Sequence, residues 1–275
     1  MDYCIVIKVQ CQQNLTNFLI LKLFEIGFDS FQEFEDGFEG SCEPQTYSER
    51  CVQEVLSPYR EVTFFIKKQE KVNWNEEWEK NYDPIIVENR CLVRASFHKS
   101  QSEFLYEIIV TPKMSFGTGH HATTYQILAY QMELDHQNKK VLDVGTGTGI
   151  LSIMAHKRGA AKIVATDIDK WCIENSVENF EINNVENFEL YCLEINQLHE
   201  TDFDIIIANI NKNILHLQMK DYAKRLKEGG ELILSGFYSN DLPNLTAEAS
   251  NHFLQKKTES TKDNWAMLVL LKQSF

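Results

Sequence analysis

The chain has 275 residues, of which 43% are hydrophobic and 24% charged, and its formal net charge is −13 at pH 7. This length suits one large domain and one small one, and the negative charge argues against a broad basic surface for DNA binding. No uncharged apolar run reaches the roughly 20 residues of a membrane helix, and residues 1–9 alternate like a strand, unlike a signal peptide, so the cytoplasm is the expected location.

Residues 1–70 predict a small α+β domain. Asp36-Gly37 is a hairpin signal between two apolar segments, and Ser48 is placed to cap a short helix. The order strand, helix, strand, strand, helix, strand is that of the ferredoxin-like fold. The strands are expected at 4–9, 30–34, 38–41 and 62–67, and the helices at 15–26 and 48–56.

Charge is unevenly distributed in this first domain. Nine acidic residues and one basic residue lie between Glu25 and Glu54. This pattern fits either a solvated face or an acidic surface that docks a basic protein.

Residues 71–84 predict a helix that links the two domains. Trp74 and Trp78 are four residues apart and would share one helix face, and Asp83-Pro84 would end the helix. The seven cysteines form no C-x-x-C pair, so reduced thiols are expected, and the sequence predicts no metal site.

Residues 85–275 predict an α/β domain built on a doubly wound, mostly parallel sheet. Strands such as residues 203–208 lack alternation, which is typical of strands buried on both faces. Two further strands near the end, 253–258 and 265–271, are expected to form an antiparallel edge hairpin. The other expected strands are 91–95, 106–110, 141–144, 162–166, 188–192 and 231–235, and the helices are 125–133, 149–158, 170–182 and 213–227.

The glycines at 145, 147 and 149 follow a buried strand and open a helix. Such glycines let the backbone approach a ligand closely. A dinucleotide site would need a third glycine where Ile150 stands. Asp143, expected near the mouth of the site, would repel a diphosphate and tolerate a cationic sulfonium. Gly145 and Gly147 are therefore expected to bind S-adenosylmethionine.

Two further polar residues stand at strand ends, the edge where open α/β sheets bind ligands. Asp167 ends the second strand of the predicted sheet and is expected to accept hydrogen bonds from both ribose hydroxyls. Asp169 is expected to cap the following helix. Asn209 ends the fourth strand, where its side-chain amide would accept from an amine and orient it towards the methyl group.

A loop of small residues, 114–124, precedes the glycine motif and enters a helix. Its glycines and threonines offer hydroxyls and amides to the carboxylate of a cofactor. His120 and His121 fit helix-capping or loop hydrogen bonds better than a catalytic role, and Phe116 fits either a cofactor cover or a core position.

At these residues the sequence resembles the bacterial ribosomal protein methyltransferases called PrmA, which modify protein eleven of the large subunit. The F-G-T-G-H-H-A-T-T loop at 116–124 is the most specific part of the resemblance, which extends over most of the chain. It implies a class I S-adenosylmethionine-dependent fold, cofactor contacts at Thr124, Gly145, Asp167 and Asn209 with Gly147 adjoining, and substrate recognition by residues 1–70.

The implied reaction is methyl transfer to lysine amines of that ribosomal protein, and also to an N-terminal amine, with no general base assigned. Three alternatives stay open at this stage. They are the same cofactor with a nucleic-acid base, small molecule or another protein as acceptor, a nicotinamide-dependent oxidoreductase, and a non-catalytic binding module. The missing Pro-Pro-aromatic run after Asn209 disfavours a base, and Ile150 disfavours the oxidoreductase.

Overall fold

The computed structural model describes residues 3–70, 82–113 and 117–274, and the chain divides into two compact units, Met1–Asn81 and Tyr82–Phe275. Most of the predicted linker helix, with both its tryptophans, falls outside the described residues, and residues 82–84 are not helical. Among the described helices, none combines the length and apolarity that a membrane span needs.

The first unit has the predicted ferredoxin-like arrangement. Its sheet has the strand order β2-β3-β1-β4 and is antiparallel throughout. The side chain of Ser48 accepts a hydrogen bond from the backbone N–H of Cys51, which confirms the predicted cap. The elements are β1 (Tyr3–Gln10), α1 (Gln13–Glu25), β2 (Ser30–Phe34), β3 (Gly37–Cys42), α2 (Glu49–Leu56) and β4 (Thr63–Glu70).

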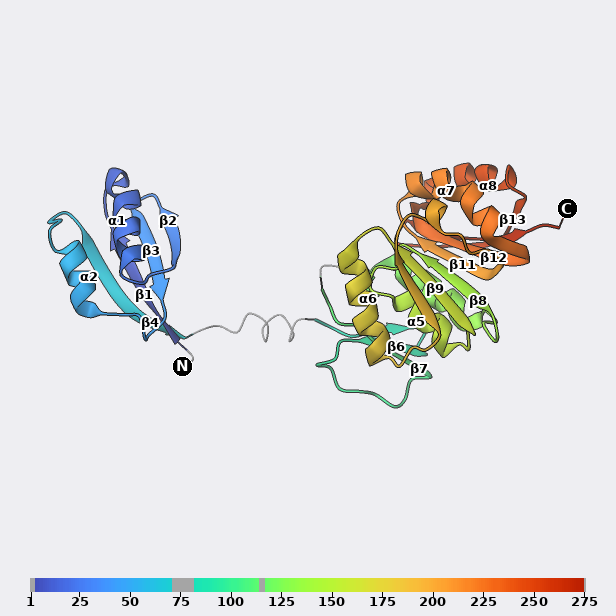
Figure 1. Cartoon of the computed structure of the whole chain (residues 1–275), viewed down its shortest axis with the longest axis horizontal. Helices are drawn as coiled ribbons and strands as arrows, with labels where there is room; N and C mark the ends of the chain where they lie inside the picture. The colour runs from blue at the N-terminus through green and yellow to red at the C-terminus, as the bar shows by residue number, and fades with distance from the viewer. Residues whose placement is uncertain (1–2, 71–81, 114–116, 275) are drawn as a thin grey trace. The chain divides into compact units, whose positions relative to one another are not determined.

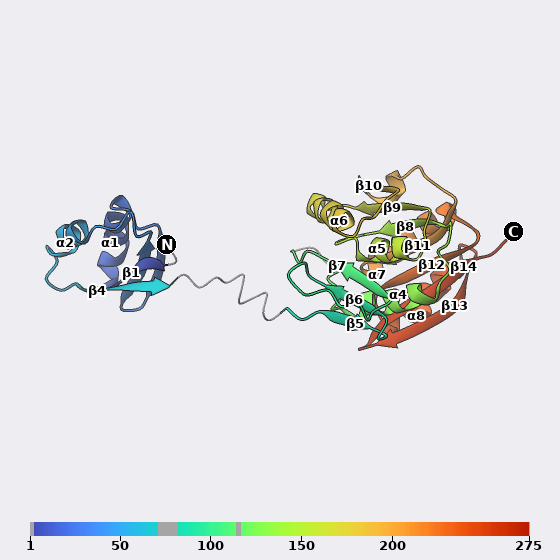
Figure 2. The ribbon, with the colours of Figure 1, turned by 90° about the horizontal axis from the view of Figure 1, so that it is seen from below.

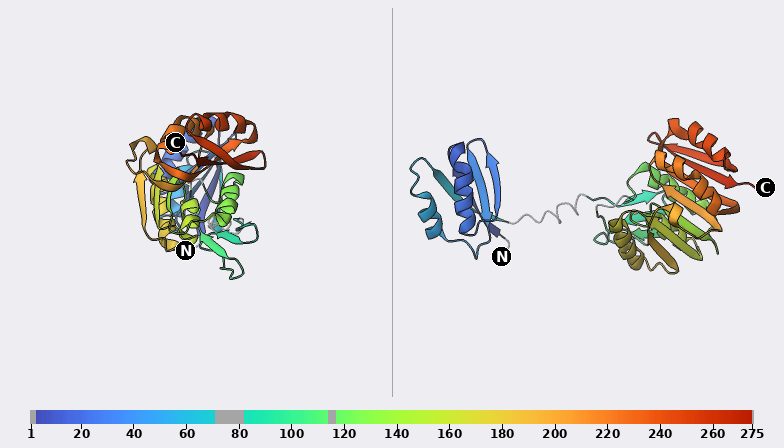
Figure 3. Two further views of the ribbon diagram at one scale, coloured as in Figure 1. Left: turned by 90° about the vertical axis from the view of Figure 1, so that its right-hand side faces the viewer. Right: turned by 45° about the horizontal axis from the view of Figure 1, so that its top comes forward.

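One buried cluster holds this unit together, because α1 and α2 cover the same face of the sheet (Figure 3). Ile7 of the central strand β1, Leu19 and Leu23 of α1, and Val52 of α2 are all fully buried. Alternation along β1 sends its apolar residues to this face, as the sequence pattern predicts.

The second unit is built on a seven-stranded sheet of order β10-β9-β8-β11-β12-β14-β13. The first five strands of that order run parallel, and β14 pairs antiparallel with both β12 and β13. This order, with its reversal between β8 and β11, confirms the predicted class I methyltransferase fold. The strands are β8 (Lys140–Val144), β9 (Lys162–Asp167), β10 (Phe188–Cys192), β11 (Phe203–Asn209), β12 (Leu226–Tyr238), β13 (Leu254–Lys262) and β14 (Trp265–Lys272).

Helices cover both faces of this sheet (Figure 1). One face packs against α4 and α5 through a first buried cluster, and the other packs against α7 and α8 through a second. The helices are α4 (Ala122–Glu133), α5 (Ile150–Lys157), α6 (Lys170–Ile182), α7 (Lys212–Arg225) and α8 (Leu242–Ser250), with short 3-10 turns at Ile195–Gln197 and Ser239–Asp241.

A small three-stranded sheet precedes the main one and is seen beside α4 in Figure 2. It consists of β5 (Ile85–Val87), β6 (Cys91–Arg94) and β7 (Tyr106–Ile109). The sequence pattern predicts the second and third of these strands. It misses β5, which has only three residues, and α8, whose Pro243 and small residues hide its helical period.

Candidate functional site

A cavity of about 820 Å³ lies at the C-terminal ends of β8, β9, β10 and β11. This edge, next to the reversal of strand order, is where open α/β sheets bind ligands, and the volume is in the range of small-molecule sites. Its lining residues are His121, Thr123, Val144, Gly145, Gly147, Thr166, Asp167, Ile168, Cys172, Leu193, Glu194, Ile195, Asn196, Asn209, Ile210, Asn211, Ile214, Leu217, Gln218, Asp221, Gly236 and Trp265.

Gly145 and Gly147, in the glycine loop between β8 and α5, line this cavity. Gly145, Gly147 and Gly149 all have positive φ angles, of 70°, 59° and 80°. A Cβ at Gly145 would overlap the side chain of Ile210, and one at Gly149 would lie 2.5 Å from a ring carbon of Phe180. Glycine is therefore required both by backbone conformation and by close packing.

A buried polar network fixes the shape of this loop. The hydroxyls of Thr146 and Ser152 donate to Asp143 Oδ2 at 2.8 and 2.7 Å. The hydroxyl of Ser176 donates to the carbonyl of Gly147 at 2.9 Å. These contacts hold the loop in place before any ligand binds.

The structure corrects the expected position of Asp143. This residue is 1% exposed and is absent from the described cavity lining, so it lies beneath the loop and not at the mouth of the site. Burial raises the pKa of Asp143 to about 6, although the two hydroxyls act in the opposite direction. Its Oδ1 has no partner among the described residues, which fits a carboxyl group that is costly to ionise.

Asp167 reaches the cavity from the end of β9, as predicted. Its Oδ2 accepts from the backbone N–H of Gly147 at 3.0 Å, and its Oδ1 accepts from that of Asp169 at 3.0 Å. Each carboxylate oxygen has a second lone pair, so the side chain is held in place and still able to accept from a ligand. Asp169 caps α6 through the backbone N–H of Trp171, which confirms its predicted role.

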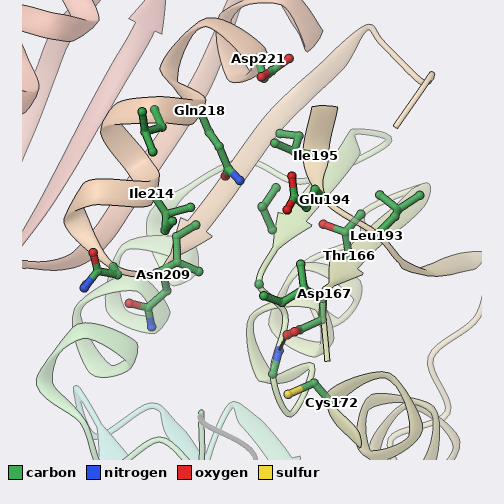
Figure 4. A pocket seen from close by; sticks show the side chains of 18 of the residues that line it. Thr166, Asp167, Cys172, Leu193, Glu194, Ile195, Asn209, Ile214, Gln218 and Asp221 are labelled. Atoms are coloured by element: carbon green, nitrogen blue, oxygen red, sulfur yellow. Dashed lines mark hydrogen bonds between the residues drawn. The ribbon is translucent and has the colours of Figure 1, made fainter. Parts of the chain in front are cut away.

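Asn209 enters the cavity from the end of β11, on the other side from Asp167 in Figure 4. Its Nδ2 donates to the hydroxyl of Thr124 at 3.3 Å, and its Oδ1 is buried without a hydrogen-bond partner among the described residues. Thr124 is fully buried and does not line the cavity itself. Thus Gly145, Gly147, Asp167 and Asn209 line one cavity, and Thr124 supports Asn209 from behind.

The charge of the cavity fits a cation. Three carboxylates, those of Asp167, Glu194 and Asp221, are found in its described lining, which contains no lysine or arginine. A diphosphate would have no side-chain cation to pair with here, whereas a sulfonium would be attracted. The residues present therefore fit S-adenosylmethionine better than a dinucleotide.

The loop before α4 is attached to the glycine motif. The hydroxyl of Thr148 donates to the carbonyl of Gly117 at 2.6 Å. His121 caps α4 by accepting from the backbone N–H of Thr123, and Nδ1 of His120 lies 3.1 Å from the hydroxyl of Thr118, so both histidines make the expected capping and loop contacts. Phe116 lies outside the described residues.

Sequence reasoning misses two groups of residues that line the cavity. Leu193, Glu194 and Ile195 follow β10, and one face of α7 contributes Ile214, Gln218 and other residues (Figure 4). The rule that ligands bind at strand ends would have pointed to the first group, because it follows a predicted strand directly. The α7 residues stand i, i+3, i+4 and i+7 along the helix, but nothing in the sequence shows which face is turned to the cavity.

Comparisons with known proteins point to one family. Residues 38–273 match the family described as Ribosomal protein L11 methyltransferase (PrmA). Relatives with that name include one from Bacteroides thetaiotaomicron, 39% identical over 93% of this chain and 94% of its own, and one from Porphyromonas gingivalis, 41% identical over 91% and 88%. The crystal structure of a ribosomal protein L11 methylase from Lactobacillus delbrueckii subsp. bulgaricus is similar with a TM-score of 0.66 and 27% identity, covering 70% of this chain and 100% of that one.

Proposed function

The chain belongs to the ribosomal protein L11 methyltransferase (PrmA) family and is an S-adenosylmethionine-dependent protein methyltransferase, and we propose that protein L11 of the large ribosomal subunit is its substrate. We further propose that lysine ε-amines, together with the N-terminal amine, are the acceptors. The observation that carries the proposal is the cavity at the strand ends, which combines a glycine loop, carboxylates without a lysine or arginine in the described lining, and Asn209.

The proposed cofactor contacts lie on both sides of the cavity. Gly145 and Gly147 would let the cofactor lie against the loop backbone, and Asp167 would accept from the ribose hydroxyls. Thr124 would act by holding the amide of Asn209. When bound, S-adenosylmethionine supplies a methyl group on a cationic sulfur, and the amine lone pair forms the N–C bond while the S–C bond breaks with its electrons left on sulfur.

The acceptor amine must be neutral to react. Removing a proton from a lysine of pKa near 10.4 costs about 4–5 kcal/mol at pH 7. Partial desolvation in the cavity lowers this cost because it disfavours the ammonium form. Asn209 is the residue that we propose orients the amine, since its Oδ1 is buried and lacks a partner in the described part of the chain. No side chain is assigned as general base, and the proton leaves with solvent.

We propose that the first unit recognises the substrate. The acidic residues between Glu25 and Glu54 give this unit a charge that suits a basic ribosomal protein. A ribosomal substrate also supports the cytoplasm as the location. The negative net charge still predicts that the protein does not bind DNA directly.

The decisive experiment incubates the purified full chain with methyl-labelled S-adenosylmethionine and separately with L11, other ribosomal proteins and ribosomal RNA. We expect label in L11 only, and peptide mass spectrometry should place it on lysines and the N-terminus. Label in RNA, or in other proteins but not in L11, would refute the substrate and leave the cofactor assignment intact.

A further inference from the structure

Three aromatic rings form a row at the end of the cavity that contains Asn209. The ring of His121 lies 4.6 Å from that of Trp265, edge to face at 69°, and the ring of Trp265 lies 4.3 Å from that of Tyr238 at 31°. His121 and Trp265 line the cavity together with Asn209 and Gly236. Tyr238 is 52% exposed, so the row extends from the cavity to the surface.

Three separate elements hold these rings in place. His121 is the N-cap of α4, where its Nδ1 accepts from the backbone N–H of Thr123, and Trp265 and Tyr238 are paired across β14 and β12. The register of that pair shifts next to Gly236, where a Cβ would meet the backbone of Ile210. The irregularity brings the end of β12 against the residue that follows Asn209.

We propose that His121, Trp265 and Tyr238 receive the side chain of the acceptor lysine and guide its amine to Asn209, and that they retain the methylated side chain for further transfers. This inference rests on the proposed function and names the residues that select the acceptor. It concerns residues that neither the glycine motif nor the strand-end rule identifies.

Lysine chemistry matches such a row of rings. Its four-carbon stem packs on apolar ring surface while its ammonium group is attracted to the ring faces. Each transfer leaves a nitrogen that still carries charge when protonated and that is bulkier and less hydrated than before. Aromatic rings bind such methylated ammonium groups well, so a partly methylated lysine should remain at the site in preference to solvent.

The test compares two substitutions of one ring, Trp265→Phe and Trp265→Leu, which both keep apolar bulk but differ in aromatic character. With purified L11 we expect Trp265→Leu to raise KM for L11 by roughly 5- to 30-fold, the equivalent of a lost cation–π contact, and to shift the products towards monomethyllysine. Trp265→Phe should stay within a few-fold of wild type in both respects. Trp171→Leu is the matched control, because Trp171 is 75% exposed on α6 and outside the cavity lining.

Calorimetric titration with S-adenosylmethionine distinguishes this inference from the function on which it rests. We expect the affinity of every Trp265 variant for the cofactor to equal that of wild type. If wild type methylates L11 while Trp265→Leu keeps both the wild-type KM and its product distribution, the aromatic row is refuted and the function stands. A loss of cofactor affinity in Trp265→Leu as large as its rise in KM for L11 would also refute the role of the aromatic row. Should Trp265→Leu not fold, Tyr238→Leu at the exposed end must show the same KM and product shifts.

Discussion

The two sides of the cavity differ in how their polar atoms are satisfied. On the glycine-loop side, buried hydroxyls pair with a carboxyl group, as Thr146 and Ser152 do with Oδ2 of Asp143, and the unpaired Oδ1 of Asp143 lies outside the described cavity lining. On the Asn209 side, the Oδ1 of Asn209 lacks a partner among the described residues, and His121 and Trp265 contribute aromatic rings to the lining. A paired network fixes the backbone before binding, whereas an unpaired acceptor is costly unless a ligand completes it. The glycine-loop side therefore has a fixed shape, whereas the Asn209 side offers an unpaired acceptor to the reacting group.

Asp167→Ala should have the largest effect, because it removes the carboxylate that we propose binds the ribose of the cofactor. Two hydrogen bonds from ribose hydroxyls to a carboxylate contribute about 1.5–3 kcal/mol each, so affinity for S-adenosylmethionine should fall roughly 10²- to 10⁴-fold. Isothermal titration calorimetry measures this directly.

Asp169→Ala is the control for that substitution. Asp169 is two residues away and outside the cavity lining, and it caps α6. Its loss should lower the free energy of unfolding by about 1 kcal/mol and leave cofactor affinity unchanged. Similar losses of affinity in both variants would show that α6, and not the carboxylate of Asp167, determines binding.

The buried Asp143 predicts a pH-dependent difference in stability. Its pKa is raised from 3.8 to about 6 by burial, so the folded state favours the neutral form. Its contribution to stability is present below the unfolded pKa and is lost as pH rises through about 6. Relative to wild type, Asp143→Asn should therefore gain about 2 kcal/mol of unfolding free energy between pH 4 and pH 7.

The effect of Asp143 is seen only in the difference in unfolding free energy between wild type and Asp143→Asn, because the contribution of His136 changes with pH in the opposite direction. Burial lowers the pKa of His136 from 6.5 to about 4, so its contribution is lost as pH falls through this range. The two opposed contributions flatten the wild-type profile. Urea unfolding of both proteins at several pH values, without cofactor, gives the difference, and a pH-independent difference would contradict the raised pKa of Asp143.

Asn209→Ala tests the chemical side of the comparison. Loss of the proposed hydrogen bond to the reacting amine should lower kcat for L11 roughly 10- to 100-fold while cofactor affinity changes little. Asn213→Ala is a suitable control, since Asn213 is exposed on α7 and outside the described lining. A kcat of Asn209→Ala equal to that of the control would show that Asn209 takes no part in the reaction. A loss confined to cofactor affinity would show that Asn209 binds the cofactor and does not orient the amine.

The comparison also shows what the sequence could and could not predict. The position of Asp167 and Asn209 in the cavity lining is predictable, because each polar residue ends a buried apolar run and strand ends meet at one edge of a parallel sheet. The position of Trp265 is not predictable in this way. Strand β14 lies between β12 and β13, and only this long-range pairing brings Trp265 beside Tyr238. The burial of Asp143 is not predictable from the sequence, because local pattern does not show that the glycine loop folds over the strand end.

The smallest expected effect is that of Thr148→Val, which tests whether the loop before α4 belongs to the shape-fixing side. The substitution keeps the size of a fully buried side chain but removes the hydroxyl that donates to the carbonyl of Gly117. The free energy of unfolding should fall by about 1 kcal/mol, and cofactor affinity should fall roughly fivefold if the loop must be held in place. Thr261→Val, at an exposed position of β13, should change both by less than about 0.5 kcal/mol. Lower stability with unchanged cofactor affinity in Thr148→Val would show that this loop does not contribute to cofactor binding.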